Sequence, residues 1–177
     1  MTTPRTRPDA AEYPAFFAGY IASVPDDDVV ELLRSTGQQV TDALSRITEE
    51  RGGYRYAEGK WSIRTMLGHL IDTERVFTYR ALRLARGDTT PLPGFDEKSF
   101  AASAESDSRT MADLVREFSA VRASSVLLFE TLPDAAWTRS GTVNNGSVSV
   151  RALAYITAGH TAHHLRVLRE RYDVTTA

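Results

Sequence analysis

The residues best suited to chemistry in this 177-residue chain are its four histidines. Three of them, His160, His163 and His164, lie close together, and the fourth is His69. Positions four apart in a helix point in about the same direction, so His160 and His164 can present two imidazoles to one ion. His163 is three residues from His160, so spacing alone leaves the choice of pair open. The apolar stripe that leads into His160 favours His164.

A histidine from another part of the chain changes what this pair could bind. His69 is on the core side of a separate predicted helix, so it can converge with His160 and His164 inside a bundle. Without it, two hydrogen-bonded core histidines would be an equally good interpretation. Three neutral imidazoles are typical ligands of zinc or nickel, and they leave a coordination position for water or substrate. We therefore predict one divalent transition metal, zinc or nickel, at His69, His160 and His164.

Other chemical groups are less clearly placed by the sequence. The chain has no cysteine, which excludes thiolate ligands and cysteine nucleophiles. Thr161 stands where the helical zinc-protease motif requires a glutamate, so protease chemistry is disfavoured. The general acid or base is left unassigned, with Asp72, Glu74 and Arg80 as weaker candidates around the site. Asp72 could orient His69 or be a further ligand, although a solvated carboxylate is the simpler interpretation. Glu74 is expected in an ion pair, with Arg80 or with another helix.

Composition excludes several classes of protein. Lysine and arginine number 21 against 23 aspartates and glutamates, so a net charge of -2 supplies no general attraction for nucleic acid or anionic lipid. No apolar stretch approaches the roughly 20 residues of a membrane span. The first residues lack the apolar run of a signal peptide. We therefore expect a cytoplasmic protein without nucleic-acid or membrane partners.

The first two helices are indicated by apolar spacing and by their end signals. Three aspartates at 26–28 favour a helix N-terminus, because their carboxylates complement the helix dipole. This first helix is predicted to continue to the glycine pair at 52–53. Ser62 is the expected N-cap of a second helix that reaches about Arg86 and ends at Gly87.

The second half of the chain predicts two more helices and a hairpin. Residues 89–100 contain two prolines and a glycine, which predicts a long ordered loop or a short extended piece. A third helix should start near Ser108 and end at Pro133. Residues 137–149 carry an Asn-Asn-Gly sequence between β-branched residues, which is typical of a small hairpin or extended excursion. The fourth helix is predicted over 150–172.

These elements predict an all-α protein with one domain. Four amphipathic helices need one another to cover their apolar faces, which makes a four-helix bundle the expected fold. A long loop should follow the second helix, and the hairpin should precede the fourth. Residues 1–12 are predicted to form a flexible N-terminal tail, and residues 13–177 to form the single helical domain.

Several segments resemble one protein family. The sequence KWSIRTMLGHLIDTER at 60–75 resembles the DinB-like superfamily, particularly its YfiT-like branch. The Tyr-Arg pair at 79–80, the sequence PLPGFDE at 91–97 and the histidine motif at 159–164 resemble its later motifs. They occur in the family order, and the resemblance covers most of residues 26–172. It implies a four-helix bundle, often a homodimer, that binds zinc or nickel through His69, His160 and His164.

The resemblance does not choose one reaction. Relatives include bacillithiol or glutathione-type thiol transferases, mycothiol-dependent isomerases and metal-dependent hydrolases. The isomerases carry a glutamate where this chain has His160, which counts against that branch. We predict a transferase in which the metal favours the thiolate of a bacillithiol-type small thiol for attack on an electrophilic substrate. The alternatives are a hydrolase that activates water at the metal and a non-catalytic metal-binding stress-response protein.

Overall fold

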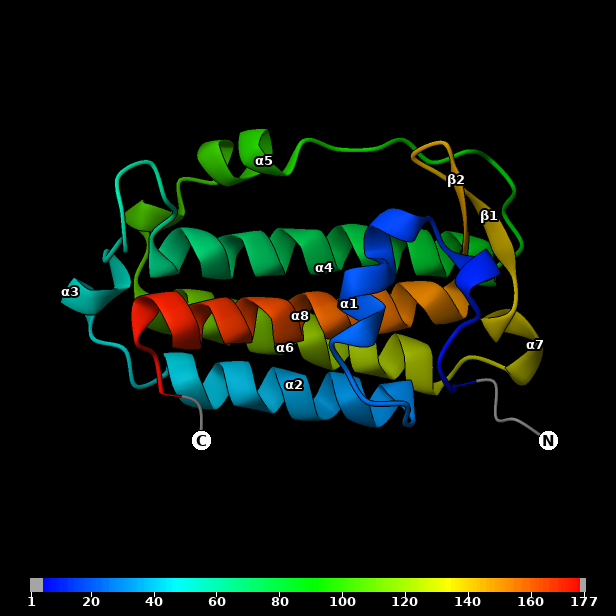
Figure 1. Cartoon of the computed structure of the whole chain (residues 1–177), viewed down its shortest axis with the longest axis horizontal. Helices are drawn as coiled ribbons and strands as arrows, with labels where there is room; N and C mark the ends of the chain where they lie inside the picture. Colours follow the sequence, from blue (N-terminus) through cyan, green and yellow to red (C-terminus); the bar gives the residue numbers. More distant parts are fainter. Residues whose placement is uncertain (1–4, 176–177) are drawn as a thin grey trace.

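Four long helices lie side by side along the length of the molecule in a computed structural model that describes residues 5–175 (Figure 1). Helix α4 packs against α6 and α8, and α2 packs against the same two helices. The predicted all-α four-helix bundle is therefore confirmed. The four helices are α2 (Val29–Leu44), α4 (Ile63–Ala85), α6 (Met111–Glu130) and α8 (Val150–Tyr172).

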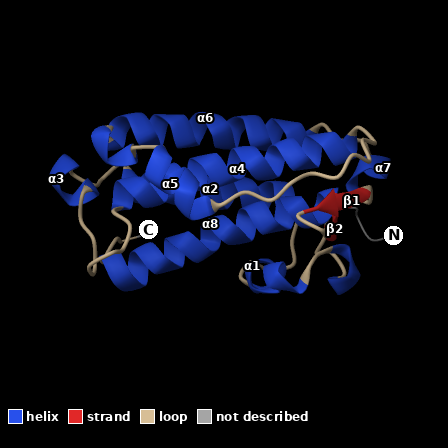
Figure 2. Ribbon diagram, turned by 90° about the horizontal axis from the view of Figure 1, so that it is seen from above, coloured by secondary structure: helices blue, strands red, loops and turns tan. Residues whose placement is uncertain are grey.

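Short elements connect and cover these four helices. A segment of 3-10 turns and one short helix precedes α2, and three short helices, a 3-10 turn and a hairpin occupy the later connections. Figure 2 shows α1 on the outer side of α8 and the hairpin at one end of the bundle. The short elements are η1 (Ala10–Glu12), η2 (Ala15–Phe17), α1 (Ala18–Ala22), α3 (Glu49–Gly52), α5 (Glu97–Ser103), η3 (Ser106–Ser108), α7 (Asp134–Trp137), β1 (Ser140–Val143) and β2 (Gly146–Ser149).

The two helices that carry the histidines begin at serine caps. The Ser62 hydroxyl accepts a hydrogen bond from the Thr65 backbone N–H at 2.9 Å, and Ser149 accepts one from Ala152 at 3.0 Å. Such caps satisfy N–H groups that have no partner within the helix. Gly87 follows α4 with a φ of +80°, a conformation that glycine adopts without steric cost. The predicted limits of both helices are confirmed within about one residue.

Two other predicted limits are wrong. The first helix ends at Leu44 rather than at the glycines 52–53, and α3 is a separate short helix. Thr48 caps α3 by accepting a hydrogen bond from the Arg51 N–H at 3.2 Å, so the chain restarts a helix there. Similarly, α6 is capped by Thr110, whose side chain accepts from the Asp113 N–H at 3.1 Å, so it begins after Ser108. Apolar spacing continues from Leu44 to Ile47 and therefore does not reveal the first break, whereas the apolar spacing of the third helix begins at Met111, where α6 begins.

The segment 89–100 is partly extended and partly helical. Leu92 donates to Thr142 and accepts from Asn144, both at 2.9 Å, so it adds a short bridge to the hairpin. The predicted extended piece is therefore present. Helix α5 was not predicted; Asp96 caps it by accepting from the N–H groups of Lys98 and Ser99. Only Ala101 of its seven residues is buried, so it carries no apolar periodicity.

The hairpin before α8 agrees with the sequence prediction. Strands β1 and β2 pair antiparallel, with Val143 opposite Gly146. Asn144 and Asn145 connect them with φ angles of +47° and +63°. Two consecutive positive φ angles are characteristic of the type I′ turn, which suits the twist of paired strands and favours asparagine.

The N-terminal segment is attached to the bundle from residue 5 onward, so the predicted flexible tail over residues 1–12 is wrong for residues 5–12; residues 1–4 lie outside the described range. The Arg7 guanidinium donates to the backbone oxygens of Ile21 and Val24 at 2.7 and 2.6 Å. Glu12 pairs with Arg151 on α8. The contacts that attach this segment are made by charged side chains with residues far away in the sequence. A polar, proline-containing sequence does not reveal such contacts.

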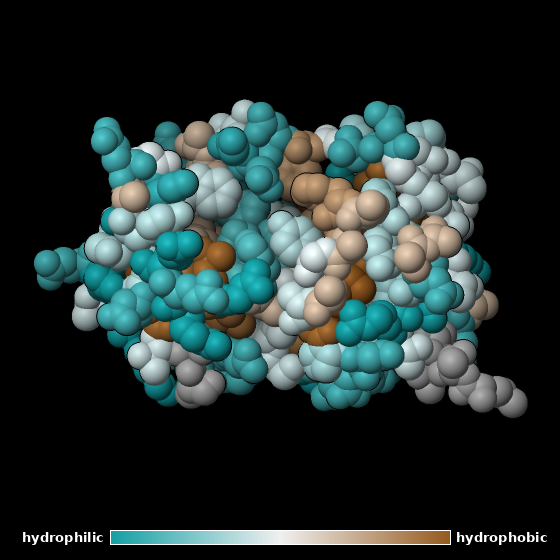
Figure 3. All heavy atoms as spheres, in the orientation of Figure 1, coloured by the Kyte–Doolittle hydropathy of each residue, from teal (hydrophilic) through white to brown (hydrophobic). Residues whose placement is uncertain are grey.

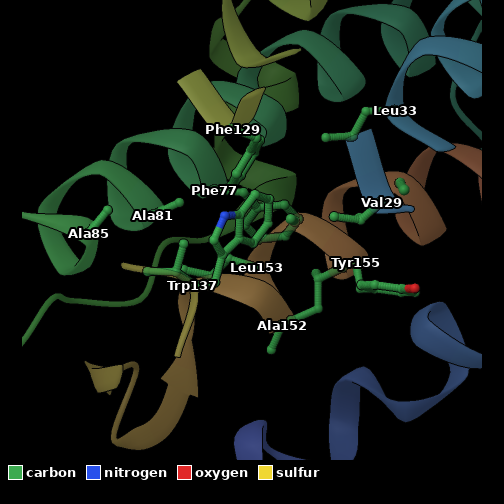
Figure 4. Close-up of a cluster of buried hydrophobic side chains, with 14 of the residues drawn as sticks. Val29, Leu33, Phe77, Ala81, Ala85, Phe129, Trp137, Ala152, Leu153 and Tyr155 are labelled. Carbon is green, nitrogen blue, oxygen red and sulfur yellow. The ribbon is translucent and has the colours of Figure 1, made fainter. Parts of the chain in front are cut away.

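The core combines apolar packing with one buried polar network. Figure 4 shows part of the apolar cluster, in which Trp137 stacks on Phe129 with ring centres 5.9 Å apart. Deeper in the bundle, Arg122 donates two hydrogen bonds to Glu74, both 2.8 Å long. Its other bonds reach Leu33 O at 2.6 Å and Thr36 and Thr161 at 3.0 and 2.8 Å. This network joins all four long helices. Of the two predicted partners of Glu74, the one on another helix is therefore correct, and Arg80 is not its partner.

Candidate metal centre

Three histidines from α4 and α8 meet in the interior of the bundle. The Nε2 atom of His160 lies 3.0 Å from Nε2 of His69 and 3.1 Å from Nε2 of His164. The ring nitrogens of all three lie within 4.8 Å of one another, and together they could hold a metal ion. His69 and His160 are buried, and His164 is partly buried. The structure thus brings together the three histidines that were predicted from the sequence.

The donor set fits a divalent transition metal. A neutral imidazole nitrogen offers either one proton or one lone pair, so Nε2 of His160 cannot satisfy both neighbouring nitrogens by hydrogen bonds. A cation that receives three lone pairs removes this conflict. Zinc–nitrogen bonds of about 2.0–2.1 Å place neighbouring ligand nitrogens roughly 2.9 Å apart at 90° and about 3.3 Å apart in a tetrahedron. The separations of 3.0 and 3.1 Å lie between these values.

Burial keeps the three imidazoles neutral, which is the form that binds metal. Burial lowers the pKa of His69 to about 4 and, together with repulsion from His69 and His163, that of His164 to about 3. The pKa of His160 is held well below 6.5, mainly by burial and then by the neighbouring His164 and His69. The site therefore does not need to lose protons at neutral pH before it can accept a cation.

A glycine precedes a metal-site histidine on each of the two helices, at a point where a neighbouring segment packs closely. Gly159 directly precedes His160, and a Cβ added to it would lie 2.0 Å from the carbonyl oxygen of Tyr20. Gly68 precedes His69, and its added Cβ would lie 2.1 Å from Ser106 Oγ. Helix α1 therefore crosses α8 in direct backbone contact, as Figure 1 shows at their crossing. The sequence signal was a Gly-His pair on each helix, which the motif-based prediction did not interpret.

Thr73, rather than Asp72, lies beside the His69 ring. Its hydroxyl is 3.3 Å from His69 Nδ1, and the Trp61 ring packs on the other part of His69 with centres 4.8 Å apart. Asp72 is partly exposed, with an oxygen 3.8 Å from Arg75, which agrees with the simpler interpretation of this residue as a solvated carboxylate. Each residue advances about 100° around a helix, and position 73 is the one that shares the face of position 69. That i+4 spacing was visible in the sequence.

His163 lies outside the three-histidine group. Its ring faces Tyr20, with ring centres 5.5 Å apart, and its Nδ1 is 3.2 Å from a nitrogen of Arg166. The partly buried side chain lines a cavity that His164 also lines. The preference for His164 over His163, which rested on the apolar stripe, agrees with this geometry.

Two cavities reach the histidine cluster from different sides. One, of about 220 Å³, touches His160 and is lined by aromatic side chains together with Arg80 and Thr73. The other, of about 480 Å³, touches His164 and includes Lys60 and Lys98. In Figure 3, hydrophobic side chains gather where the segment around α1 crosses this face of a mostly hydrophilic surface. The arrangement offers space for two small molecules beside one set of ligands.

Comparison with known proteins places this chain in a family. The family model of the DinB superfamily matches residues 32–168, which is more than half of the chain. The chain belongs to the DinB superfamily. This DinB-superfamily chain is 25% identical over 126 residues to "Putative metal-dependent hydrolase OB0413" of Oceanobacillus iheyensis, a match that covers 70% of this chain and 72% of that protein.

Two solved structures share the fold of this DinB-superfamily protein. YfiT from Bacillus subtilis, described as a probable metal-dependent hydrolase with an unusual four-helix-bundle topology, matches with a TM-score of 0.70 and 18% identity over 80% of this chain and 82% of YfiT. The mycothiol-dependent maleylpyruvate isomerase matches with a TM-score of 0.68 and 14% identity. That match covers 82% of this chain and 61% of the isomerase.

None of the helices within residues 5–175 is long and apolar enough to cross a membrane.

The stability of the metal-free protein should fall in mild acid. Unfolded histidines bind protons near pH 6.5, whereas folded His69 does so only near pH 4. The unfolded state therefore binds more protons between these two pH values. The contribution of His69 to the stability of the folded state is complete above pH 6.5 and is lost as the pH falls toward 4. Each buried histidine should contribute a slope of up to about 1.4 kcal/mol per pH unit. Urea unfolding between pH 4.5 and 7.5 measures this slope.

A matched variant separates this effect from carboxylate titration. His69→Gln should flatten the pH dependence between pH 5 and 6.5, whereas His163→Gln should change it less, because His163 is only partly buried. An equal slope in the wild type and in His69→Gln would contradict the low pKa of His69.

Proposed function

We propose that this DinB-superfamily protein is a metal-dependent transferase that joins a small bacillithiol-type thiol to an electrophile. His69, His160 and His164 would hold one zinc or nickel ion. The observation that carries the proposal is the convergence of their three neutral Nε2 atoms beside two cavities. A divalent ion held there lowers the pKa of a thiol bound to it. We also propose a homodimer, which sedimentation velocity would test.

The two cavities support a reaction between two molecules. Lys60 and Lys98 give the cavity beside His164 two ammonium groups that suit the carboxylates of a small thiol. The cavity beside His160 has Tyr20 and Phe77 in its wall, which would shield an electrophile from water. In the transfer, the sulfur forms a bond to the electrophilic carbon, the leaving group departs with the bonding electrons, and the thiol proton passes to solvent.

Hydrolysis is the second candidate, because the Oceanobacillus protein and YfiT are both described as metal-dependent hydrolases. The same three histidines could place a water molecule beside an ester or amide in one cavity. The cavity that contains Lys60 and Lys98 would then have no second reactant to bind, whereas the transferase uses both cavities.

A thiol-consumption assay distinguishes the functions. Protein stripped of metal and reloaded with zinc or nickel is incubated with bacillithiol or glutathione and a panel of alkyl and acyl electrophiles, and products are identified by mass spectrometry. The proposal expects a thiol adduct that depends on both metal and protein. Product formed without thiol would establish the hydrolase, and tight metal binding without turnover of any substrate would favour a structural role for the ion. His163→Ala serves as the histidine control for metal binding and should keep its metal, because His163 lines the cavity beside His164 but lies outside the three-histidine group.

A further inference from the structure

Arg80 is a buried cation that has no counter-ion among the described residues 5–175. It lies on α4 with a relative exposure of 5% and lines the cavity beside His160. Its Nη2 donates to the backbone oxygen of Pro93 at 2.8 Å, and its guanidinium carbon lies 5.6 Å from the Phe95 ring centre. Within residues 5–175, no carboxylate lies within 4.0 Å of it.

Arg122, a second buried arginine of the bundle, provides a comparison, because its guanidinium is fully paired within the protein. Arg122 is equally buried, at 5%, and Glu74 receives two hydrogen bonds from it. Three more bonds to oxygens of α2 and α8 complete its set. The fold thus neutralises and saturates Arg122 but gives Arg80 one carbonyl and one aromatic face. Burial lowers the pKa of Arg80, as expected for a cation without a paired carboxylate.

The surroundings of Arg80 indicate which kind of ligand could bind its guanidinium. The cavity measures about 220 Å³, which suits a small organic molecule. Phe17, Tyr20 and Phe77 form aromatic walls, and His160 brings the candidate metal centre to the same space. A guanidinium presents its N–H groups in a planar fork that matches a carboxylate. The cavity therefore combines an apolar wall with one anion-binding group beside the proposed metal ligands.

We propose that Arg80 binds the carboxylate of a small organic acid whose apolar body lies among Phe17, Tyr20 and Phe77, next to His160. This inference rests on the proposed function, because that acid would be the electrophile of the transfer. It adds a substrate class and a specificity-determining residue. The bond to Pro93 and the contact with Phe95 hold the guanidinium in place and leave its remaining N–H groups for the ligand.

Glu97 offers a second test, in which the substitution should strengthen anion binding instead of weakening it. Its exposed side chain lines the same cavity at the start of α5. Burial, with a smaller contribution from the Glu97 carboxylate, raises the pKa of Tyr20, so this negative charge acts within the cavity. It should repel an incoming carboxylate. Removing the charge at Glu97 should therefore tighten anion binding, while removing the charge at Arg80 should weaken it.

Calorimetric titration with benzoate and with neutral benzamide tests the proposal, using both zinc-loaded and zinc-free protein. Benzoate should bind the wild type more tightly than benzamide does in both forms. Arg80→Gln should weaken benzoate binding by about tenfold or more, because a charge-assisted bidentate pair is lost. Arg80→Lys should give an intermediate affinity, and Glu97→Gln should strengthen binding about twofold to threefold. The control Arg86→Gln removes the same charge from an exposed position at the end of α4 and should bind like the wild type.

The outcomes separate this proposal from the proposed function. Equal benzoate affinity in Arg80→Gln and the wild type, equal affinity for benzoate and benzamide, or no benzoate binding would each overturn it. Thermal melts and zinc titration show whether Arg80→Gln is folded. If that variant does not fold, the comparison of benzoate with benzamide and the variants Arg80→Lys and Glu97→Gln still decide the question. Benzoate binding that depends on Arg80 in protein unable to bind zinc would retain this inference while the metal mechanism fails.

Discussion

Replacing His160 with alanine should weaken zinc binding by about 100-fold or more, because even groups that only support metal ligands contribute 10- to 100-fold. His160 should be the most sensitive of the three histidines. Its Nε2 is the atom that lies within 3.1 Å of the Nε2 atoms of both His69 and His164. Competition with a chromogenic zinc chelator at pH 7 measures the affinity, and elemental analysis measures the zinc content.

A second histidine on the same helix provides the control. His163→Ala removes an imidazole three residues from His160, but its ring faces Tyr20 and lies outside the three-histidine group. Zinc affinity should therefore stay within about twofold of the wild type. Circular dichroism confirms that each variant is folded. An unchanged affinity in His160→Ala, or an equal loss in His163→Ala, would contradict the proposed ligand set and the metal-dependent reaction with it.

Glu74→Ala should destabilise the protein by about 3–5 kcal/mol, because it leaves the Arg122 guanidinium buried without a counter-charge. Both side chains of this pair are nearly inaccessible to solvent. For a domain of this size, such a loss lowers the melting temperature by roughly 10 °C. Urea unfolding at pH 7 measures the free energy, and calorimetry measures the melting temperature.

An exposed ion pair is the matched control. Glu31→Ala removes a carboxylate that pairs with Arg34 on the surface of α2, and it should cost less than about 1 kcal/mol. The double variant Glu74→Leu with Arg122→Met should recover much of the stability lost in Glu74→Ala, because no charge then stays buried unpaired. A loss below 1 kcal/mol in Glu74→Ala would show that Arg122 finds water or another partner, and that the network does not organise the bundle.

The sequence by itself determined the elements whose signals are local. The serine cap at Ser62, the helical spacing of the two histidine-bearing segments and the turn at 144–146 act over a few residues. These signals predicted both histidine-bearing helices, the hairpin and hence the bundle. The choice of His69, His160 and His164 followed from helical faces that were already correct. Periodicity could not show the break after Leu44 or the short helix α5, because apolar spacing crosses the first and is absent from the second.

Only the tertiary structure decided which distant groups meet. The partner of Glu74 is Arg122, 48 residues away, and the anchor of Glu12 is Arg151. The two cavities likewise combine side chains from several elements. Arg80 lines a cavity only because the segments around α1 and α5 contribute the other side chains of its wall. The physical reason is that a helix fixes neighbours within four residues through its own hydrogen bonds, whereas contacts between helices depend on how whole faces pack. Residue types and spacing therefore placed the histidines on the right faces, and packing determined what surrounds them.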